Sequence, residues 1–480
     1  MEQNVRSNQI LQKNLKPSWV FSVALGSAVG WGAFVLPYSW VESSGVLSTI
    51  TGFIIGASLV SVVAICYGKA VQHLPVTGGG VAYAYASAGK IHALIAGWSL
   101  ILGYIGIVAL NASAVALVFR SLLPQISQTI ELYEFSGWTI YLPEVLISLV
   151  FLVLFSFINI RGSKFSGAFQ WFAVLMMFSS VALILISCLV LAITDNFNLA
   201  PPNSPSISLT GVMTIVAFAP WAFVGFDGVP QLGGELNFSP KKVLLLLIAA
   251  IMAATFIYIA MTLSTAISLQ GIHENIDDRP WPVATAIGSL LGQLGLILLS
   301  VSVTAGVLTG LNGFFASSSR VILSMARASM LPQWFGRLDP RFGTPRNAVL
   351  FVMAVSAVTP WFGRSTLSWV VDMTSVGIAI AYFYVCLCVY KIGRYGLVPG
   401  LQSPVVKSPA LAFIGLAGCA ISTFFLALLL LPFSPGKLGT EALIALVVWV
   451  LLGSLLITST SSRYRAIPPQ KIVKILYGSD

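Results

Sequence analysis

The stretch GSAVGWG at residues 26–32, followed by Pro37, interrupts an apolar segment that otherwise has the length of a membrane span. Glycine costs a helix interior about 1 kcal/mol and proline about 3 kcal/mol, so a cluster of the two predicts a break in the helix. The stretch PWAFVGFDGVP at residues 220–230 has the same character, and its step from Gly225 to Pro230 repeats the step from Gly32 to Pro37. Two matching breaks predict an internal repeat with a binding site between its halves.

The composition around these breaks is that of a membrane protein. Of the 480 residues, 57% are hydrophobic and 8% are charged, whereas a soluble domain carries about 25% charged residues. Soluble enzymes, secreted disulfide scaffolds and nucleic-acid binders are excluded on this ground. Twelve apolar segments have the length that crosses about 30 Å of hydrocarbon, and we predict spans at residues 18–41, 46–70, 91–119, 142–160, 169–194, 208–235, 242–270, 284–318, 347–362, 368–390, 409–431 and 439–459.

The distribution of charge predicts the orientation of these spans. If the amino terminus is cytoplasmic, 21 of the 25 Lys and Arg residues lie on the cytoplasmic side or at helix ends that face it, and the others are Arg120, Arg279, Arg364 and Lys437. This asymmetry predicts a multi-pass protein of the cell (inner) membrane with both termini in the cytoplasm. The less favoured interpretation of the net charge of +10 is a basic patch for a partner, and we expect no nucleic-acid partner.

The sequence shows no pattern that indicates a cofactor or a metal. The five cysteines lie inside apolar spans without a C-x-x-C pair, and the three histidines lack the spacing of metal ligands. The glycine run at residues 78–80 is not followed by the Lys-Ser/Thr pair of a phosphate-binding loop, which argues against an ATP-driven pump. No catalytic set of side chains shares a predicted cavity, so we expect no enzyme, no cofactor and no metal site.

Each break lies in the first span of a five-span block, and an odd number of spans inverts the second block relative to the first. Unwound backbone in lipid would leave peptide groups unsatisfied, so each break must line a polar cavity. Free N–H groups there suit a carboxylate, and free carbonyls suit an ammonium group. The alternative is that the glycines only allow close helix packing. The predicted domains are a cytoplasmic tail (1–17), a first inverted repeat (18–200), a second inverted repeat (201–395), two added helices (396–462) and a second cytoplasmic tail (463–480).

Asp227 is the acidic residue that the sequence places deepest in an apolar span. An ionised carboxylate at the centre of a bilayer costs on the order of 3 kcal/mol, so it is functional by default. A proton and a cationic substrate would compete for its charge, which makes Asp227 the predicted coupling residue. The alternative is a structural carboxylate bonded to the amides of the break. Glu235, Asp372 and Glu441 are predicted near helix ends, where water reaches them.

Aromatic side chains and one amide accompany the two breaks. Trp31 lies in the first break, and Trp221 and Phe226 flank the second, where they could stack on a substrate cation. Helix packing explains these aromatic residues equally well. Asn111, in the third span, either faces the cavity or makes an interhelical hydrogen bond.

Four segments carry a resemblance to a known family. Residues 26–37 fit the pattern G-S-x-x-G-x-G-x-F-x-x-P, and residues 75–85 follow P-x-x-G-G-x-Y-x-Y with one extra residue. Residues 223–227 match a family stretch that ends in Glu or Asp. Along nearly its whole length the chain resembles the amino acid–polyamine–organocation (APC) superfamily of secondary transporters. The most specific match is the loop after the eighth span, with Asn312, Ser319-Arg320, Met325-Ala326-Arg327, Leu331-Pro332, Phe335 and Thr344-Pro345 in the family's order.

The resemblance implies an all-α integral membrane fold of twelve helices, LeuT-like, with a five-plus-five inverted repeat, two added carboxyl-terminal helices and discontinuous helices 1 and 6. It implies that backbone in the first span binds a substrate carboxylate, that carbonyls in the sixth span bind the amine, and that Asp227 responds to protons. The substrate-binding residues implied are Ser27, Ala28, Gly30, Trp31, Gly32, Leu110, Trp221, Val224, Gly225, Phe226 and Asp227.

The chain departs from the family pattern at two positions. Several members carry a lysine in the fifth span that stands in for a sodium ion, and the aligned residue here is Met177. The residue between the glycines of the first span is usually small, whereas here it is Trp31, which would narrow or reshape the pocket.

We therefore predict a secondary active transporter, a permease or exchanger, that moves amino acids or related amines across the lipid bilayer by alternating access. The predicted driving force is exchange or a proton gradient. The alternative is a membrane sensor that binds the same small molecule without net transport. The sequence contains no signal for an oligomeric state.

Overall fold

The computed structural model describes residues 11, 13–194, 207–270, 272, 276, 279, 281–363, 365–396 and 407–477. Within this part of the chain, eight helices are long and apolar enough to cross a membrane, and each coincides with a predicted span. The protein is therefore a multi-pass, all-α membrane protein. The eight helices are α5 (Val46–His73), α7 (Lys90–Leu122), α9 (Leu142–Arg161), α10 (Ser163–Thr194), α13 (Val243–Leu269), α14 (Pro282–Arg327), α16 (Ser365–Tyr395) and α17 (Pro409–Leu430).

The other four predicted spans lie outside these eight helices. The first is divided into α2 (Pro17–Ala28), α3 (Gly32–Val35) and α4 (Pro37–Ser44), and the sixth into α11 (Leu209–Ala222) and α12 (Gly228–Gln231). The breaks expected from the glycine and proline clusters are confirmed at both places. The remaining two segments correspond to α15 (Arg346–Ser356) and α18 (Thr440–Ala466).

Short elements join the long helices. A β-hairpin, absent from the sequence prediction, pairs β1 (Glu131–Phe135) with β2 (Trp138–Tyr141) in antiparallel register. Its turn places Ser136 and Gly137 at positive φ (51° and 75°), which matches the right-handed twist of paired strands. The other short elements are α6 (Gly79–Ala88), α8 (Pro124–Ser127), α19 (Pro469–Tyr477), η1 (Gly233–Glu235), η2 (Pro240–Lys242), η3 (Gln333–Gly336) and η4 (Thr359–Phe362).

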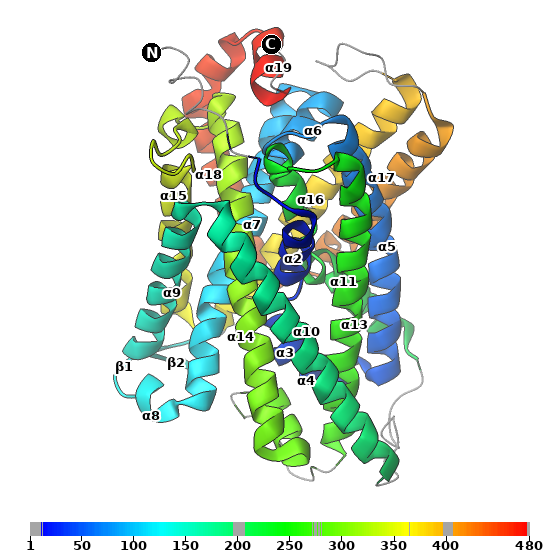
Figure 1. Ribbon diagram of the computed structural model, residues 1–480, viewed down its shortest axis with the longest axis vertical. Helices are drawn as coiled ribbons and strands as arrows, with labels where there is room; N and C mark the ends of the chain where they lie inside the picture. The colour runs from blue at the N-terminus through cyan, green and yellow to red at the C-terminus, as the bar shows by residue number, and fades with distance from the viewer. Residues whose placement is uncertain are drawn as a thin grey trace.

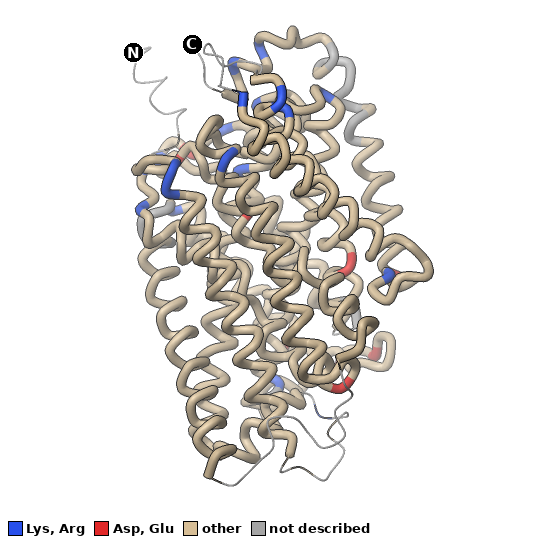
Figure 2. The backbone as a smooth tube through the Cα atoms, turned by 90° about the vertical axis from the view of Figure 1, so that its right-hand side faces the viewer, with Lys and Arg blue, Asp and Glu red and all other residues tan. Residues whose placement is uncertain are grey.

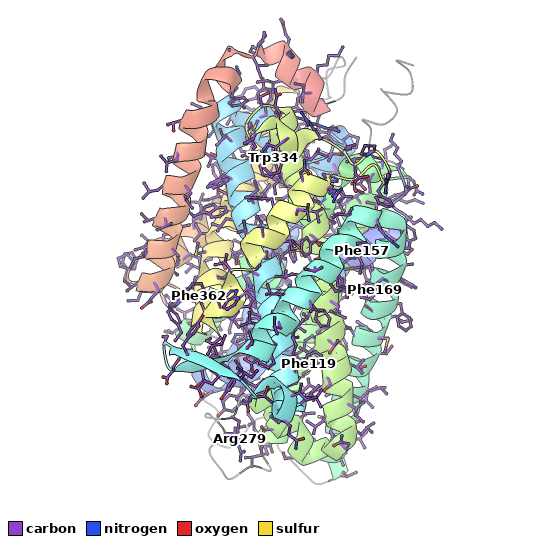
Figure 3. The ribbon with its side chains drawn as sticks, turned by 90° about the vertical axis from the view of Figure 1, so that its left-hand side faces the viewer. Phe119, Phe157, Phe169, Arg279, Trp334 and Phe362 are labelled. Atoms are coloured by element: carbon purple, nitrogen blue, oxygen red, sulfur yellow. The ribbon has the colours of Figure 1, made fainter. Side chains whose placement is uncertain are left out.

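The interrupted helices lie inside the bundle. α2 packs against α10, α13 and α14, and α11 packs against α5 (Figure 1). By contrast, α9 and α10 carry large apolar side chains on their outer faces. Phe157 is 50% exposed and Phe172 is 61% exposed, and Phe157 lies on the face shown in Figure 3. Apolar side chains exposed along whole helices are expected where lipid covers them.

The two ends of the molecule differ in charge. Lys and Arg gather at the end that holds both termini (Figure 2), and the β-hairpin lies at the opposite end (Figure 1). The amphipathic helix α19 covers the first end, where Ile472 and Leu476 are buried and the Tyr477 hydroxyl donates a hydrogen bond to the Ala82 carbonyl (2.9 Å). Gathering of cations on one side of a membrane protein is the pattern expected of its cytoplasmic face.

Candidate functional site

The first break separates α2 from α3. The amide of Val29 donates the last α2 hydrogen bond, to the Leu25 carbonyl (2.9 Å), but its own φ and ψ (−108° and 84°) leave the helical region. The helix resumes at Gly32, and the amides of Phe34 and Val35 then donate to the carbonyl of Trp31 (3.0 and 3.1 Å). The helix is therefore interrupted at Val29 and Gly30, while Trp31 already has helical backbone angles (φ −53°, ψ −34°) as the residue that precedes α3.

The second break separates α11 from α12 and is organised by Asp227. Gly225 takes a φ of 130°, which only glycine adopts readily. Its amide donates to Asp227 Oδ1 (2.8 Å), while the Tyr104 hydroxyl of α7 donates to Asp227 Oδ2 (2.7 Å). The Gln231 side chain donates to the Asp227 carbonyl (3.0 Å). This fully buried carboxylate thus accepts a hydrogen bond from an amide of the break, which is the structural role that the sequence left open as the alternative for Asp227.

The two breaks touch each other through main-chain atoms. A Cβ added at Gly225 would lie 2.5 Å from the Ala28 nitrogen and 2.5 Å from the Ser27 carbonyl carbon, closer than real Cβ contacts. The Tyr258 hydroxyl, from α13, lies within hydrogen-bond distance of the Ala28 carbonyl (3.2 Å) and of the Ala222 carbonyl (2.9 Å). One side chain therefore contacts the last carbonyl of both interrupted helices.

Aromatic rings pack where the breaks meet. The rings of Trp31 and Trp221 approach edge to face, with centroids 6.2 Å apart. A Cβ at Gly32 would lie 2.2 Å from the Trp221 ring, so the small residue at position 32 is required by this contact. Phe226 is fully buried and packs against Tyr67 and Tyr382. The rings close the space around the breaks on the α11 side.

Three polar atoms at the first break have no hydrogen-bond partner among the described residues: Ser27 Oγ, Trp31 Nε1 and Asn111 Oδ1. All three residues are more than nine-tenths buried. Asn111 comes from α7, and its Oδ1 lies 3.3 Å from the position of a Cβ added at Gly30. Buried polar atoms are normally satisfied by protein, water or ligand. The first break is therefore the part of the site that can still accept a polar ligand.

A cavity of about 640 Å³ lies beside the first break, between α4, α11, α16 and the β-hairpin, and we call it the outer cavity. Ligand pockets in proteins measure about 300–1,000 Å³. Trp31 is the predicted site residue that lines it; Val224 and Leu110 are buried away from it in the bundle. Its lining includes Trp31, Trp40, Trp138, Thr214, Phe218 and Asp372.

On the opposite side of the breaks, toward the termini, lies a buried ion pair. Arg320 of α14 donates two hydrogen bonds to the carboxylate of Glu235 (2.8 and 3.3 Å), and both residues are buried. The prediction that water reaches Glu235 was wrong, because the arginine replaces that water. The Leu15 amide donates to the Glu235 carbonyl (3.0 Å), which ties the start of the chain to the same place.

Met177 lies beside the end of α2. Its sulfur is 3.5 Å from the position of a Cβ added at Gly306, and the Val29 carbonyl is 2.8 Å from the same position. The side chain beside the end of α2 is therefore an uncharged thioether. Among the described residues, no group of three or more His, Cys, Asp and Glu side chains is arranged to hold a metal ion.

The site therefore contains the predicted residues of both breaks and two tyrosines that sequence reasoning missed, Tyr104 and Tyr258. Both lie in apolar stretches of their helices, where no local signal separates a tyrosine that bonds the breaks from one that packs elsewhere. Asn111 was considered from the sequence, and the structure places it against the first break.

Comparison of the sequence with known proteins identifies its family. The family model described as amino acid permease matches residues 15–455. A methylthioribose transporter of Bacillus subtilis is 24% identical, with 90% of each chain covered. Cationic amino acid transporter 1 of Arabidopsis thaliana is 23% identical over 86% of this chain and 68% of its own length. A branched-chain amino acid permease of Lactococcus lactis is 24% identical over 78% of this chain and 80% of its own. The chain therefore belongs to the amino acid permease family of the APC superfamily.

Proposed function

We propose that this permease is a secondary transporter that carries amino acids or related amines across the cell membrane by alternating access. Substrate binds where the two breaks meet. The observation that supports this site is the set of unpartnered polar atoms on Ser27, Trp31 and Asn111. The hydroxyl and indole N–H can donate to a carboxylate, and the amide oxygen can accept from an ammonium group. An amino acid offers both groups to these partners.

The substrate-binding residues of the proposal divide between the two breaks. The first break contributes Ser27, Ala28, Gly30, Trp31 and Gly32 toward the carboxylate. The second contributes Trp221, Val224, Gly225, Phe226 and Asp227 toward the amine, and Leu110 packs beside them. The contact between Gly225 and the backbone of Ser27 and Ala28 supports a single site rather than two.

In this proposal the chain has twelve spans in a five-plus-five inverted repeat, with repeats at 18–200 and 201–395 and two added helices at 396–462. Both terminal tails are cytoplasmic. The cations at the end with the termini support that orientation (Figure 2). The outer cavity then faces outward, while the Arg320–Glu235 pair closes the cytoplasmic side. This arrangement is one of the two states that alternating access requires.

Asp227 is the proposed proton-coupling residue. Its two oxygens accept hydrogen bonds from the Gly225 amide and the Tyr104 hydroxyl. A proton on Oδ1 would face the N–H donor of Gly225 and remove that bond, whereas a proton on Oδ2 could be donated to the Tyr104 hydroxyl, which also accepts. Protonation of Oδ1 would therefore loosen the second break, which links proton binding to the shape of the substrate site.

The relatives do not share one cargo, because their names refer to methylthioribose, cationic amino acids and branched-chain amino acids. All of them are named as transporters or permeases, which favours transport over a sensor. We therefore choose the test to identify the substrate and to separate these two functions.

The test is counterflow in liposomes that contain the purified protein. A thermal-shift screen with L-lysine, L-arginine, L-leucine, putrescine and methylthioribose selects the ligands that stabilise the protein by binding. Liposomes loaded with each unlabelled ligand should then accumulate the same radiolabelled ligand above protein-free liposomes. Stabilisation by a ligand without counterflow of that ligand would support the sensor and contradict transport.

A further inference from the structure

Asp372, on α16, is an acidic side chain of the outer cavity that the proposed transport mechanism does not use. Its hydrogen bond within the described residues comes from the Gly439 amide to Oδ2, at 3.4 Å. That distance is at the weak limit of hydrogen bonding. Asp372 is absent from the ion pairs found among the described residues.

Asp372 is only partly buried, and the buried acids of the described helices have strong partners. Asp227 accepts from a backbone amide and a tyrosine, at 2.8 and 2.7 Å. Glu235 pairs with Arg320, and Glu144 pairs with Arg120. A carboxylate held near membrane depth is costly unless a cation or several donors satisfy it. Asp372 therefore differs from them in having an oxygen left for a donor that enters the cavity.

The rest of the outer cavity suits an organic cation. Trp31, Trp40, Trp138 and Phe218 line it, and no Lys or Arg of the described residues does. Aromatic faces attract ammonium and guanidinium groups, with about 0.5–2 kcal/mol for each contact. The Arg120 guanidinium already lies over the Trp138 ring, 4.1 Å from its centroid, so the rings that the proposal assigns to a solute cation are those of Trp31, Trp40 and Phe218.

Trp31 links the outer cavity to the first break. Its ring lines the cavity and packs on Trp221, and its buried indole N–H has no hydrogen-bond partner in the part of the chain that the structure describes. A solute that rests between Asp372 and Trp31 is therefore next to the polar atoms of the breaks. The cavity lies on the route by which a solute would reach them from the side of the β-hairpin.

We propose that Asp372 and the aromatic rings of the outer cavity form a second binding site, for the ammonium or guanidinium group of a cationic amino acid or amine. This proposal rests on the proposed function for the fate of the solute, but not for its binding. The outer site selects solutes by positive charge before they reach the breaks.

The test measures binding of L-lysine, putrescine and L-leucine to the full-length protein in detergent, by isothermal titration calorimetry. In Asp372→Asn, the Kd of L-lysine and of putrescine should rise about tenfold, as loss of one ion pair near a membrane predicts. Any L-leucine binding should keep its Kd. The matched control is Glu441→Gln, which neutralises an exposed acid that also lies close to Gly439 and should leave all three unchanged.

A second variant separates the outer site from the breaks. Gly225→Ala disturbs the contact between the breaks but does not touch the outer cavity, so it should retain Asp372-dependent putrescine binding even if counterflow is lost. Unchanged L-lysine and putrescine binding in Asp372→Asn, or no binding of either probe by the wild-type protein, would overturn the outer site. Absence of counterflow for every ligand, with putrescine binding intact, would instead overturn the proposed transport.

Discussion

The break between α11 and α12 is held by side-chain hydrogen bonds, whereas the break between α2 and α3 leaves three polar side-chain atoms without a hydrogen-bond partner among the described residues. At the second break, Asp227, Tyr104 and Gln231 satisfy one another and the Gly225 amide. At the first break, Ser27 Oγ, Trp31 Nε1 and Asn111 Oδ1 are the atoms that have no such hydrogen bond. Two breaks of similar sequence therefore have different roles. The second break fixes the geometry of the site, and the first supplies the groups that a substrate can bind.

The largest effect is expected from Gly225→Ala, which disturbs both breaks at once. The new methyl group would meet main-chain atoms of Ser27 and Ala28 at 2.5 Å, and these atoms cannot rotate away. We expect counterflow to fall about a hundredfold and the free energy of unfolding to fall by about 3 kcal/mol. Radiolabelled counterflow and thermal unfolding in detergent measure the two effects.

The matched control is Gly343→Ala. Gly343 also has a positive φ (65°), but a Cβ there meets nothing within 4 Å. This variant should lower the free energy of unfolding by about 1 kcal/mol, because alanine adopts a positive φ less readily than glycine, and it should leave counterflow intact. Equal transport by the two variants would show that the contact between the breaks is not required.

Asp227→Asn removes the organiser of the second break. Asparagine can keep its oxygen on the Gly225 amide and turn its NH2 group toward the Tyr104 hydroxyl, so the change replaces two hydrogen bonds to a charged group with weaker neutral ones, and we expect the free energy of unfolding to fall by about 1 kcal/mol. If Asp227 couples protons, net uptake should become independent of pH while some exchange persists. Uptake measured between pH 5 and pH 8 checks this.

Tyr104→Phe is the comparison for Asp227→Asn, because it removes one hydrogen bond to the carboxylate but keeps the acid. It should lower stability by about 1 kcal/mol and preserve the pH dependence of uptake. A wild-type pH profile in Asp227→Asn would leave Asp227 with its structural role alone.

At the first break, Ser27→Ala should affect transport more than stability. The Ser27 hydroxyl has no partner among the described residues, so its loss should change the free energy of unfolding by no more than about 0.5 kcal/mol. The KM for the transported amino acid should rise about tenfold, because a donor to the carboxylate is lost. Ser148→Ala, which removes another unpartnered buried hydroxyl from the peripheral helix α9, should change neither quantity.

The smallest effect on transport is expected from Tyr258→Phe, which removes a contact shared by the two breaks. The variant keeps the ring and removes the hydroxyl that lies near the carbonyls of Ala28 and Ala222. We expect a loss of about 1 kcal/mol and a change of about twofold in the counterflow rate. An effect as large as that of Gly225→Ala would mean that this hydroxyl, rather than the main-chain contact, joins the breaks.

The sequence was a good guide to the breaks and a poor guide to what holds them. Glycine and proline act locally, so both interruptions were found where the residues cluster. Tyr104 and Tyr258 act across the bundle, and their helices give no periodic signal that points to the breaks. The Arg320–Glu235 pair was missed for the same reason, since its members are far apart in the chain.

The β-hairpin at residues 131–141 was missed for another reason. Its strands are short, and the prediction concentrated on apolar spans. A signal was present, because Ser136-Gly137 lies between two segments rich in aromatic and β-branched residues. The hairpin contributes Trp138 to the outer cavity, so this oversight concerned the candidate site as well as the fold.

The main-chain contact between Gly225 and residues 27–28 has a consequence for how such a protein can diversify. A joint that depends on a particular side chain would be lost when that residue mutates. A joint between two peptide backbones needs only the absence of a side chain at one position. The residues around it can then change with the cargo while the mechanical connection between the two halves persists.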